Sequence, residues 1–339
     1  IGPESAGSEP GPVCYGKGNT MPTVTDANLV LGRINPLAPI GKGIAALDVN
    51  AAKRAIELHI ADPLNLSVME ASDAIIRVAN SKMAGAIRLI SIERGYQPES
   101  FVLMPFGGGG ALHAGALIQD VGLSKAVIPR YPGAMSAFGC VVADIRFDRV
   151  KTINALLEEL DIRLLNEEAQ RLQKELFESL ETSKRSVKEV SVCLELDMNY
   201  VGQTHTINVR LSEQPINAER VRSRFEDTYQ RIYSTILEDI PIRILNLRII
   251  LVGKRPDFDL SLLVRSASPL GKTAGAATRD MWVEGSWQPT PVYQRDHLEP
   301  GVVIVGPCLI EQADSTVLVD EKLKGSIDSY GNLIMELDS

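Results

Sequence analysis

The hydrophobic pattern of the first hundred residues predicts a loop-rich start followed by two helices. Asp48 precedes the apolar spacing of a short helix, which we expect to end before Pro63. Ser67 and Glu70 form a capping box, and apolar residues at helical spacing continue to a C-terminal cap at Gly95. The second helix is therefore expected to span roughly 25 residues, long enough to cross a whole domain.

The next segment alternates short apolar runs with helical patterns. The run FVLMPF at residues 101–106 predicts a buried strand, and a helix is expected at residues 112–122. A second strand is expected at residues 125–130, followed by a helix of small residues at 136–145. This β-α-β-α order favours a parallel sheet that is covered on both faces.

From about residue 151 the pattern becomes that of an α+β unit. It predicts two amphipathic helices, at residues 164–183 and 218–233. It also predicts three strands, at residues 190–200, 205–211 and 243–253. The last sixty residues predict short strands broken by Gly, Pro and Asp. We therefore expect an α/β part at residues 1–150, an α+β domain at 151–255, and a linker with a β-rich C-terminal module at 256–339.

Composition narrows the classes of partner. The 339 residues carry a net charge of −8 and only 5% aromatic residues, and they contain no basic stripe. Nucleic acid and anionic membranes are therefore not expected as partners. No apolar run approaches a membrane span and no signal peptide is recognisable, while four scattered cysteines fit reduced thiols, so we expect a cytoplasmic location. The first residue is Ile in a loop-like context, which suggests a fragment, a processed chain or one half of a larger protein.

The stretch PFGGGGALHAGAL at residues 105–117 is the first candidate for a binding site. Four glycines stand between an apolar run and a helix. The stretch matches neither the P-loop nor the dinucleotide fingerprint, because the Lys-Ser/Thr ending and the G-x-G-x-x-G spacing are both absent. Bare backbone before a helix N-terminus suits an adenosine and its phosphates, but it equally suits a tight turn.

Three other residues allow a functional and a structural interpretation. Asp26 is a candidate catalytic carboxylate at a phosphate or metal site, or simply the cap of the short helix that follows it. His113 is either a site residue or a cap or packing residue. Cys14 has no base nearby in the sequence, so a structural thiol is expected. The four histidines lie too far apart for their spacing to indicate a metal site.

Several long motifs, taken in order, resemble those of the hydantoinase A / 5-oxoprolinase family. The N-terminal loop GPESAGSEPGPVCYG leads into PTVTDANLVLGRINP. The glycine stretch is followed by VIPRYPGAMSAFGCVVADIR, which is similar to the PGxxSAxG segment of that family. YVGQTHTINV and PVYQRDHLEPGVVIVGPCLIEQADSTVLV resemble its C-terminal region. The matches run from residue 2 to about residue 335.

The resemblance implies part of an actin/hexokinase-like ATPase fold with additional C-terminal domains. It places the adenosine of ATP against Gly107, Gly108, Gly109, Gly110, Ala111 and His113. It further implies ATP and Mg²⁺ as cofactors and the phosphorylation of a carbonyl oxygen as the shared chemistry. The substrate would be a cyclic amide that is opened by water, as in hydantoinases and 5-oxoprolinases. The alternative is a ketone that is carboxylated.

The chain departs from the family pattern in one respect, because the D-x-G-G-T phosphate loops are absent. It therefore resembles only the C-terminal half of such a protein. We expect it to act with an N-terminal half and with a hydantoinase B type subunit. A non-catalytic assembly module, retained only to pack against a partner, is the remaining alternative.

Overall fold

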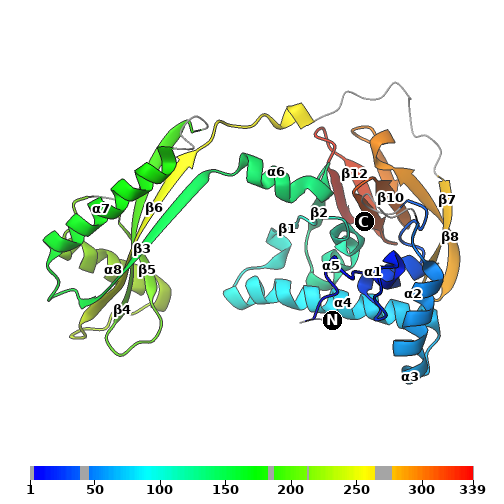
Figure 1. Ribbon diagram of the computed structural model, residues 1–339, viewed down its shortest axis with the longest axis horizontal. Helices are drawn as coiled ribbons and strands as arrows, with labels where there is room; N and C mark the ends of the chain where they lie inside the picture. The colour runs from blue at the N-terminus through cyan, green and yellow to red at the C-terminus, as the bar shows by residue number, and fades with distance from the viewer. Residues whose placement is uncertain (1–3, 39–45, 182–186, 212–213, 264–276, 339) are drawn as a thin grey trace. The chain divides into compact units, whose positions relative to one another are not determined.

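The computed structural model of the protein describes residues 4–38, 46–181, 187–211, 214–263 and 277–338. The chain divides into two compact units (Figure 1). The first unit combines Ile1–Gly139 with Asp259–Ser339, and the second is Cys140–Phe258. This division differs from the three parts expected from the sequence, because the C-terminal segment packs into the same unit as the N-terminal one.

The helices of the first unit follow local capping signals. They are α1 (Val24–Val30), α2 (Val49–Ile56), α3 (Asp62–Leu64), α4 (Val68–Ile90), α5 (Ala114–Val121) and α6 (Met135–Val142), the last of which crosses the boundary between the units. The predicted cap of α2 is confirmed, since Asp48 accepts a hydrogen bond from the N–H of Ala51 at 2.8 Å. The capping box of Ser67 and Glu70 at the start of α4 is confirmed as well.

The helix that begins after Asp48 was expected to end before Pro63, and this expectation is wrong. After α2 the chain continues through a π-helical turn at Glu57–Ala61 into α3, which contains Pro63. Pro63 lies in the first turn of α3, where a missing N–H is tolerated. The helical path ends at Asn65, whose φ of 52° is left-handed.

Two sheets complete the first unit. One has the strand order β1-β2-β13-β12-β9 and the other β11-β10-β8-β7. Their strands are β1 (Val102–Leu103), β2 (Lys125–Ile128), β7 (Ala277–Val283), β8 (Ser286–Gln294), β9 (Val303–Val305), β10 (Cys308–Gln312), β11 (Ser315–Val319), β12 (Leu323–Ile327) and β13 (Leu333–Leu337). The expected parallel sheet is wrong, because within the first of these sheets only β1 and β2 pair in parallel. Since β13 pairs with β2, the C-terminal strands belong to the sheet that the N-terminal segment begins.

The run FVLMPF was expected to be a buried strand, and this expectation is also wrong. Only two of its residues form β1, at the edge of the five-stranded sheet. The side chains of Phe101, Val102, Met104 and Phe106 are between 44% and 53% exposed. An apolar sequence therefore predicts a buried strand only where further layers cover it, and in the described structure no layer covers these four side chains.

The second unit is an antiparallel sheet with two helices on one face (Figure 1). The strand order is β3-β6-β4-β5. The strands are β3 (Ile145–Leu156), β4 (Glu189–Tyr200), β5 (Ile207–Leu211) and β6 (Ile242–Lys254), and the helices are α7 (Ile162–Glu181) and α8 (Ala218–Tyr233). Both helices and three of the strands match the sequence-based expectation. The long strand β3 was missed, because its apolar and polar residues alternate only from Ile145 to Asp148 and none of its residues is fully buried.

The core of the second unit lies between this sheet and its helices. The buried leucines of α7, at positions 165, 172, 176 and 180, belong to the same apolar cluster as the inward residues of β4 and β6, and α7 packs on β3 and β6. Phe225 of α8 is fully buried and meets Tyr200 of β4 edge-to-face, with ring centroids 4.9 Å apart. One continuous apolar layer therefore holds the unit together.

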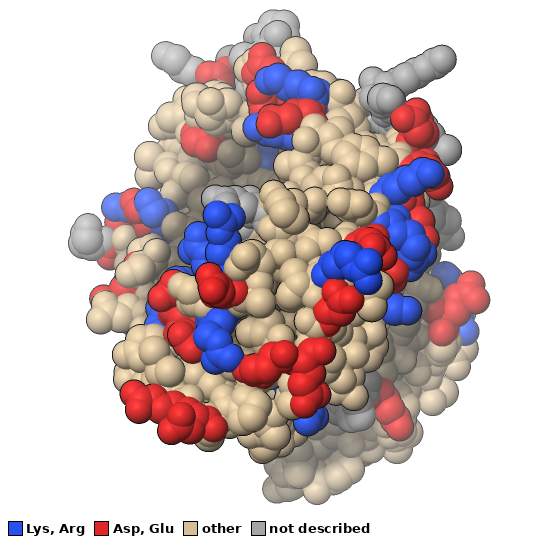
Figure 2. Space-filling model, turned by 90° about the vertical axis from the view of Figure 1, so that its left-hand side faces the viewer, with Lys and Arg blue, Asp and Glu red and all other residues tan. Residues whose placement is uncertain are grey.

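The described helices include none that is both long and apolar enough to cross a membrane. On the face drawn in Figure 2, acidic and basic side chains are interspersed among uncharged ones. This distribution agrees with the mixed charge read from the sequence.

Candidate functional site

The glycine loop forms a turn between β1 and α5. Gly107 has a φ of +82°, a left-handed conformation that favours glycine. Its N–H donates to the carbonyl of Pro132 at 2.7 Å, and the hydroxyl of Ser315 donates to the carbonyl of Gly108 at 3.4 Å. Residues Gly110–Leu112 then form a 3-10 turn that leads into α5. The loop is therefore anchored through its own backbone.

The other side of this loop is open. A Cβ atom built on Gly107 or Gly109 would meet nothing within 4 Å. Within the described part of the chain, the N–H groups of Gly108 and Gly109 donate no hydrogen bond to another residue. Free backbone N–H donors next to a helix N-terminus attract the acceptor atoms of a ligand, and they attract anionic acceptors most strongly. The geometry thus fits a ligand that approaches the bare backbone. Binding such a ligand would be a role for the open glycines in addition to forming the turn.

A second glycine segment supports this loop from the opposite side. Gly133, in the PGAM stretch, donates its N–H to the Asp314 carboxylate at 2.9 Å. A Cβ on Gly133 would lie 2.6 Å from Asp314, so a larger residue there would displace the β10–β11 turn. Asp314 and Ser315 come from the far end of the sequence, and local patterns gave no signal that they contact this loop.

Asp26 is fully buried, and donors from the protein itself occupy its carboxylate. Oδ2 accepts hydrogen bonds from the N–H groups of Val13 (3.1 Å) and Thr23 (2.8 Å) and from the Thr23 hydroxyl (2.8 Å). Oδ1 accepts from the N–H of Cys14 at 2.8 Å. These bonds complete a capping box in which Thr23 is the N-cap of α1 and Asp26 is the third residue of the helix. Asp26 therefore supports the helix start as expected, but from inside α1 and not from the position before it. A catalytic role for Asp26 remains a prediction.

His113 lies at the start of α5, and its ring is turned toward α4. Nδ1 is 2.7 Å from Oδ1 of Asn80, and because an amide oxygen only accepts, Nδ1 carries the proton. The side chain is buried, and burial, with a smaller contribution from the charge of Arg33, lowers the pKa of His113 to about 4. The imidazole is therefore neutral near pH 7 and links α5 to α4. Contact of His113 with a nucleotide remains a prediction.

The structure gives the surroundings of the Cys14 thiol and of the residues that could hold a metal ion. Cys14 is buried, and burial, reinforced by the nearby Asp26 charge, raises the pKa of its thiol far above the ordinary value. In the part of the chain that the structure describes, no group of three or more His, Cys, Asp or Glu side chains is placed to hold a metal ion.

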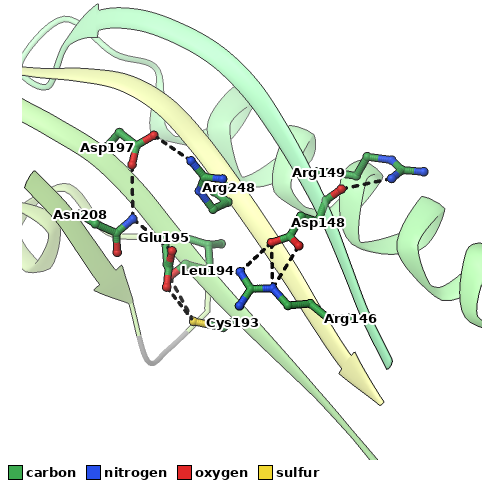
Figure 3. A network of polar contacts seen from close by, with 9 residues as sticks. All are labelled: Arg146, Asp148, Arg149, Cys193, Leu194, Glu195, Asp197, Asn208 and Arg248. Carbon is green, nitrogen blue, oxygen red and sulfur yellow. Dashed lines mark hydrogen bonds and ion pairs between the residues drawn. The ribbon is translucent and has the colours of Figure 1, made fainter. Parts of the chain in front are cut away.

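A polar network of the second unit lies on the sheet face opposite the helices (Figure 3). Asp197 accepts from Asn208 at 3.3 Å and forms an ion pair with Arg248 at 3.4 Å, and Arg146 contacts Asp148 through two nitrogens. Burial raises the pKa of Cys193 beside this network. Because acids and bases satisfy each other across the strands, the network is typical of a solvated sheet face rather than of a reaction centre.

Comparison with known families covers almost the whole chain. Residues 1–149 match the family model described as hydantoinase/oxoprolinase. Residues 158–337 match the one described as the hydantoinase/oxoprolinase C-terminal domain. Both the glycine loop and Asp26 lie within the first of these matches.

Individual relatives agree with the family models. The chain is 36% identical to the caprolactamase subunit alpha of Pseudomonas jessenii, over 97% of this chain and 48% of that protein. It is 33% identical to the acetophenone carboxylase gamma subunit of Aromatoleum aromaticum, over 99% of this chain and 47% of that protein. The crystal structure of the ATP-dependent caprolactamase from Pseudomonas jessenii superposes with a TM-score of 0.73 and 32% identity, covering 100% of this chain and 50% of that one. The chain thus spans about half the length of the relatives that it matches.

Proposed function

Because the chain belongs to the hydantoinase/oxoprolinase family, we propose that it supplies the adenosine-contacting part of an ATP-dependent enzyme that opens a cyclic amide with water. The observation that supports this most directly is the open glycine loop, whose Gly108 and Gly109 N–H groups lack partners within the described residues. In this proposal the backbone of Gly107–Gly110 and Ala111 receives the nucleoside, and α5 directs its N-terminus toward the phosphates.

Bound ATP, with Mg²⁺, would supply the phosphoryl group that makes an unreactive carbonyl oxygen a better leaving group. The residues of this chain would bind and orient the nucleotide. Asp26 would keep the N-terminal loop folded around α1, and the neutral His113 would hold α5 in place through Asn80. The phosphate-binding and metal-binding residues would come from an N-terminal half and a hydantoinase B type subunit. This agrees with the subunit names of the relatives and with their doubled length.

An ATP-dependent ketone carboxylase is the second candidate, since a carboxylase subunit is among the relatives. We prefer the hydrolase because the identity to the caprolactamase subunit is higher, 36% against 33%. The solved structures do not separate the two candidates, since an acetone carboxylase superposes over 99% of this chain and the caprolactamase over 100%. Product analysis of the purified assembly with lactams, and with ketones plus bicarbonate, separates the two candidates. Hydrolysis yields an amino acid, whereas carboxylation yields a keto acid.

The experiment that tests nucleotide binding is calorimetric titration of the complete assembly with Mg-ATP, after its subunits have been identified by intact mass. Gly109→Val is expected to weaken binding about 100-fold, because the new side chain would fill the open face of the loop. Gly139→Val in α6 is the matched control, since a Cβ there also meets nothing within 4 Å. Equal affinity of the two variants would show that the glycines serve only the turn and would favour the assembly-module alternative.

A further inference from the structure

A polar cavity lies in the first unit, away from the glycine loop. It measures about 640 Å³ and is lined by α4, α5, the β7–β8 hairpin and the segment after β11. None of the residues from Gly107 to His113 lines it. The glycine loop and this cavity are therefore separate places at which a ligand can bind.

Arg33 contributes an unpartnered guanidinium to this cavity. The backbone of its loop is fixed, because Arg279 donates to the carbonyls of Gly32 (3.0 Å) and Arg33 (3.4 Å) while it holds Glu311 at 2.7 Å. The Nε atom of Arg33 is buried and has no hydrogen-bond partner within the described residues. The charges of Asp320 and Asp73 act on this guanidinium without a hydrogen bond to it. A buried N–H without an acceptor is costly, so a ligand group that accepts a hydrogen bond from it has an advantage.

Asp320 contributes the opposite charge to the same cavity. Its Oδ2 lies directly over Gly115 of α5, where a Cβ would approach it to 1.9 Å. Within the described residues the carboxylate accepts no hydrogen bond, and it forms no ion pair with Arg33 within 4.0 Å. Burial raises the pKa of Asp320 to about 6, and the charge of Arg33 partly opposes this rise. Two opposite charges thus line one cavity without contacting each other.

The remaining lining residues select the kind of molecule that fits. Six acidic and three basic side chains line the cavity, so a simple anion such as phosphate is disfavoured. One of the acids, Asp73, is already paired with Arg77 at 3.1 Å. A simple cation would leave Arg33 unsatisfied, whereas a single molecule with both charges satisfies both groups.

We infer that the cavity binds a zwitterionic amino acid, whose carboxylate contacts Arg33 and whose ammonium group contacts Asp320. Guanidinium and carboxylate pair through two parallel hydrogen bonds, and an ammonium group donates to a carboxylate. The inference rests on the cavity and not on the proposed reaction. Opening a lactam with water nevertheless yields a molecule of this class, so the cavity would suit a product of that reaction.

The test is calorimetric titration of the 339-residue chain, without nucleotide, with 6-aminohexanoate, 5-aminopentanoate and glycine. At least one amino acid is expected to bind saturably with a Kd of about 1 mM or below. Hexanoate and hexylamine, which each carry one of the two charges, are expected to bind at least about tenfold more weakly. Equal binding of hexanoate, or no saturable heat with any amino acid, would overturn the inference.

Variants of Asp320 and Arg33 test which residue binds the ammonium group of the ligand and which binds its carboxylate. Asp320→Asn and Arg33→Gln are each expected to weaken binding about tenfold or more, whereas Arg94→Gln, at an exposed position outside the cavity, leaves it unchanged. Tryptophan fluorescence of the unmodified chain also reports binding, because Trp282 lines the cavity and the chain has only two tryptophans. Saturation of the tryptophan emission at the calorimetric Kd supports the site. Saturable heat without a change in emission would place the ligand elsewhere and refute it.

Discussion

In the second unit the ionised side chains of the sheet pair with one another, whereas in the first unit Arg33 and Asp320 lie largely buried without forming an ion pair. Asp197 and Arg248 are half-buried diagonal neighbours on adjacent strands, and each satisfies the charge of the other. The first unit also presents open backbone at Gly108 and Gly109. The difference supports the proposal that the first unit binds the ligands, whereas the extensive apolar cluster of the second unit serves its stability.

The largest expected effect tests the second unit as a purely structural part. Phe225→Ala removes a fully buried ring that packs edge-to-face on Tyr200, so the free energy of unfolding is expected to fall by about 4 kcal/mol. Urea denaturation followed by circular dichroism measures it, with the more exposed Phe177→Ala as the control, expected to cost about 1 kcal/mol or less. Nucleotide affinity is expected to stay unchanged. A parallel loss of affinity would mean that the second unit takes part in the site.

The next effect separates the structural and catalytic roles of Asp26. Asp26→Ala leaves the N–H groups of Val13, Cys14 and Thr23 without their acceptor, so we expect a loss of about 3 kcal/mol in unfolding free energy. Asp48→Ala is the matched control, because Asp48 caps α2 at an exposed position through one N–H, and it is expected to cost about 1 kcal/mol. Unchanged stability together with lost ATP turnover would instead establish a catalytic carboxylate.

The sequence predicted the parts of this molecule that depend on neighbouring residues. The caps at Asp48 and Ser67 and the buried leucine stripe of α7 are local patterns, and the structure contains them. Contacts between distant segments were not predictable in this way. Asp314 reaches Gly133 across 181 residues, and Asp320 faces Arg33 from the other end of the chain. The run FVLMPF misled for a related reason, because its burial depends on layers that a local pattern does not specify.

The buried His113 of the first unit is expected to make the free energy of unfolding depend on pH. Its pKa is about 4 in the folded state against about 6.5 when unfolded, so the unfolded chain binds the proton first as the pH falls. The stability that the neutral imidazole contributes is therefore present above pH 6.5 and lost toward pH 4. Between pH 7.5 and pH 5 the loss is expected to be about 2 kcal/mol.

Comparing wild type with His113→Gln isolates this contribution. The comparison is needed because Asp320 acts with the opposite sign: its raised pKa makes stability fall as the pH rises through about 6. His205→Gln, at an exposed position, is the control and should leave the pH profile unchanged. An identical profile for wild type and His113→Gln would show that the imidazole is not held neutral between α4 and α5.

The smallest effect compares two helical glycines of the first unit. A Cβ at Gly85 in α4 meets nothing within 4 Å, so Gly85→Ala is expected to raise the unfolding free energy by about 0.5 to 1 kcal/mol through helix propensity alone. Gly115→Ala in α5 has the same propensity term, but its Cβ would collide with Asp320, so a net loss is expected. Thermal denaturation of both variants decides the sign. If both substitutions stabilise the chain, the Asp320 carboxylate does not lie against α5, and the cavity lacks the acidic end that an amino acid would need.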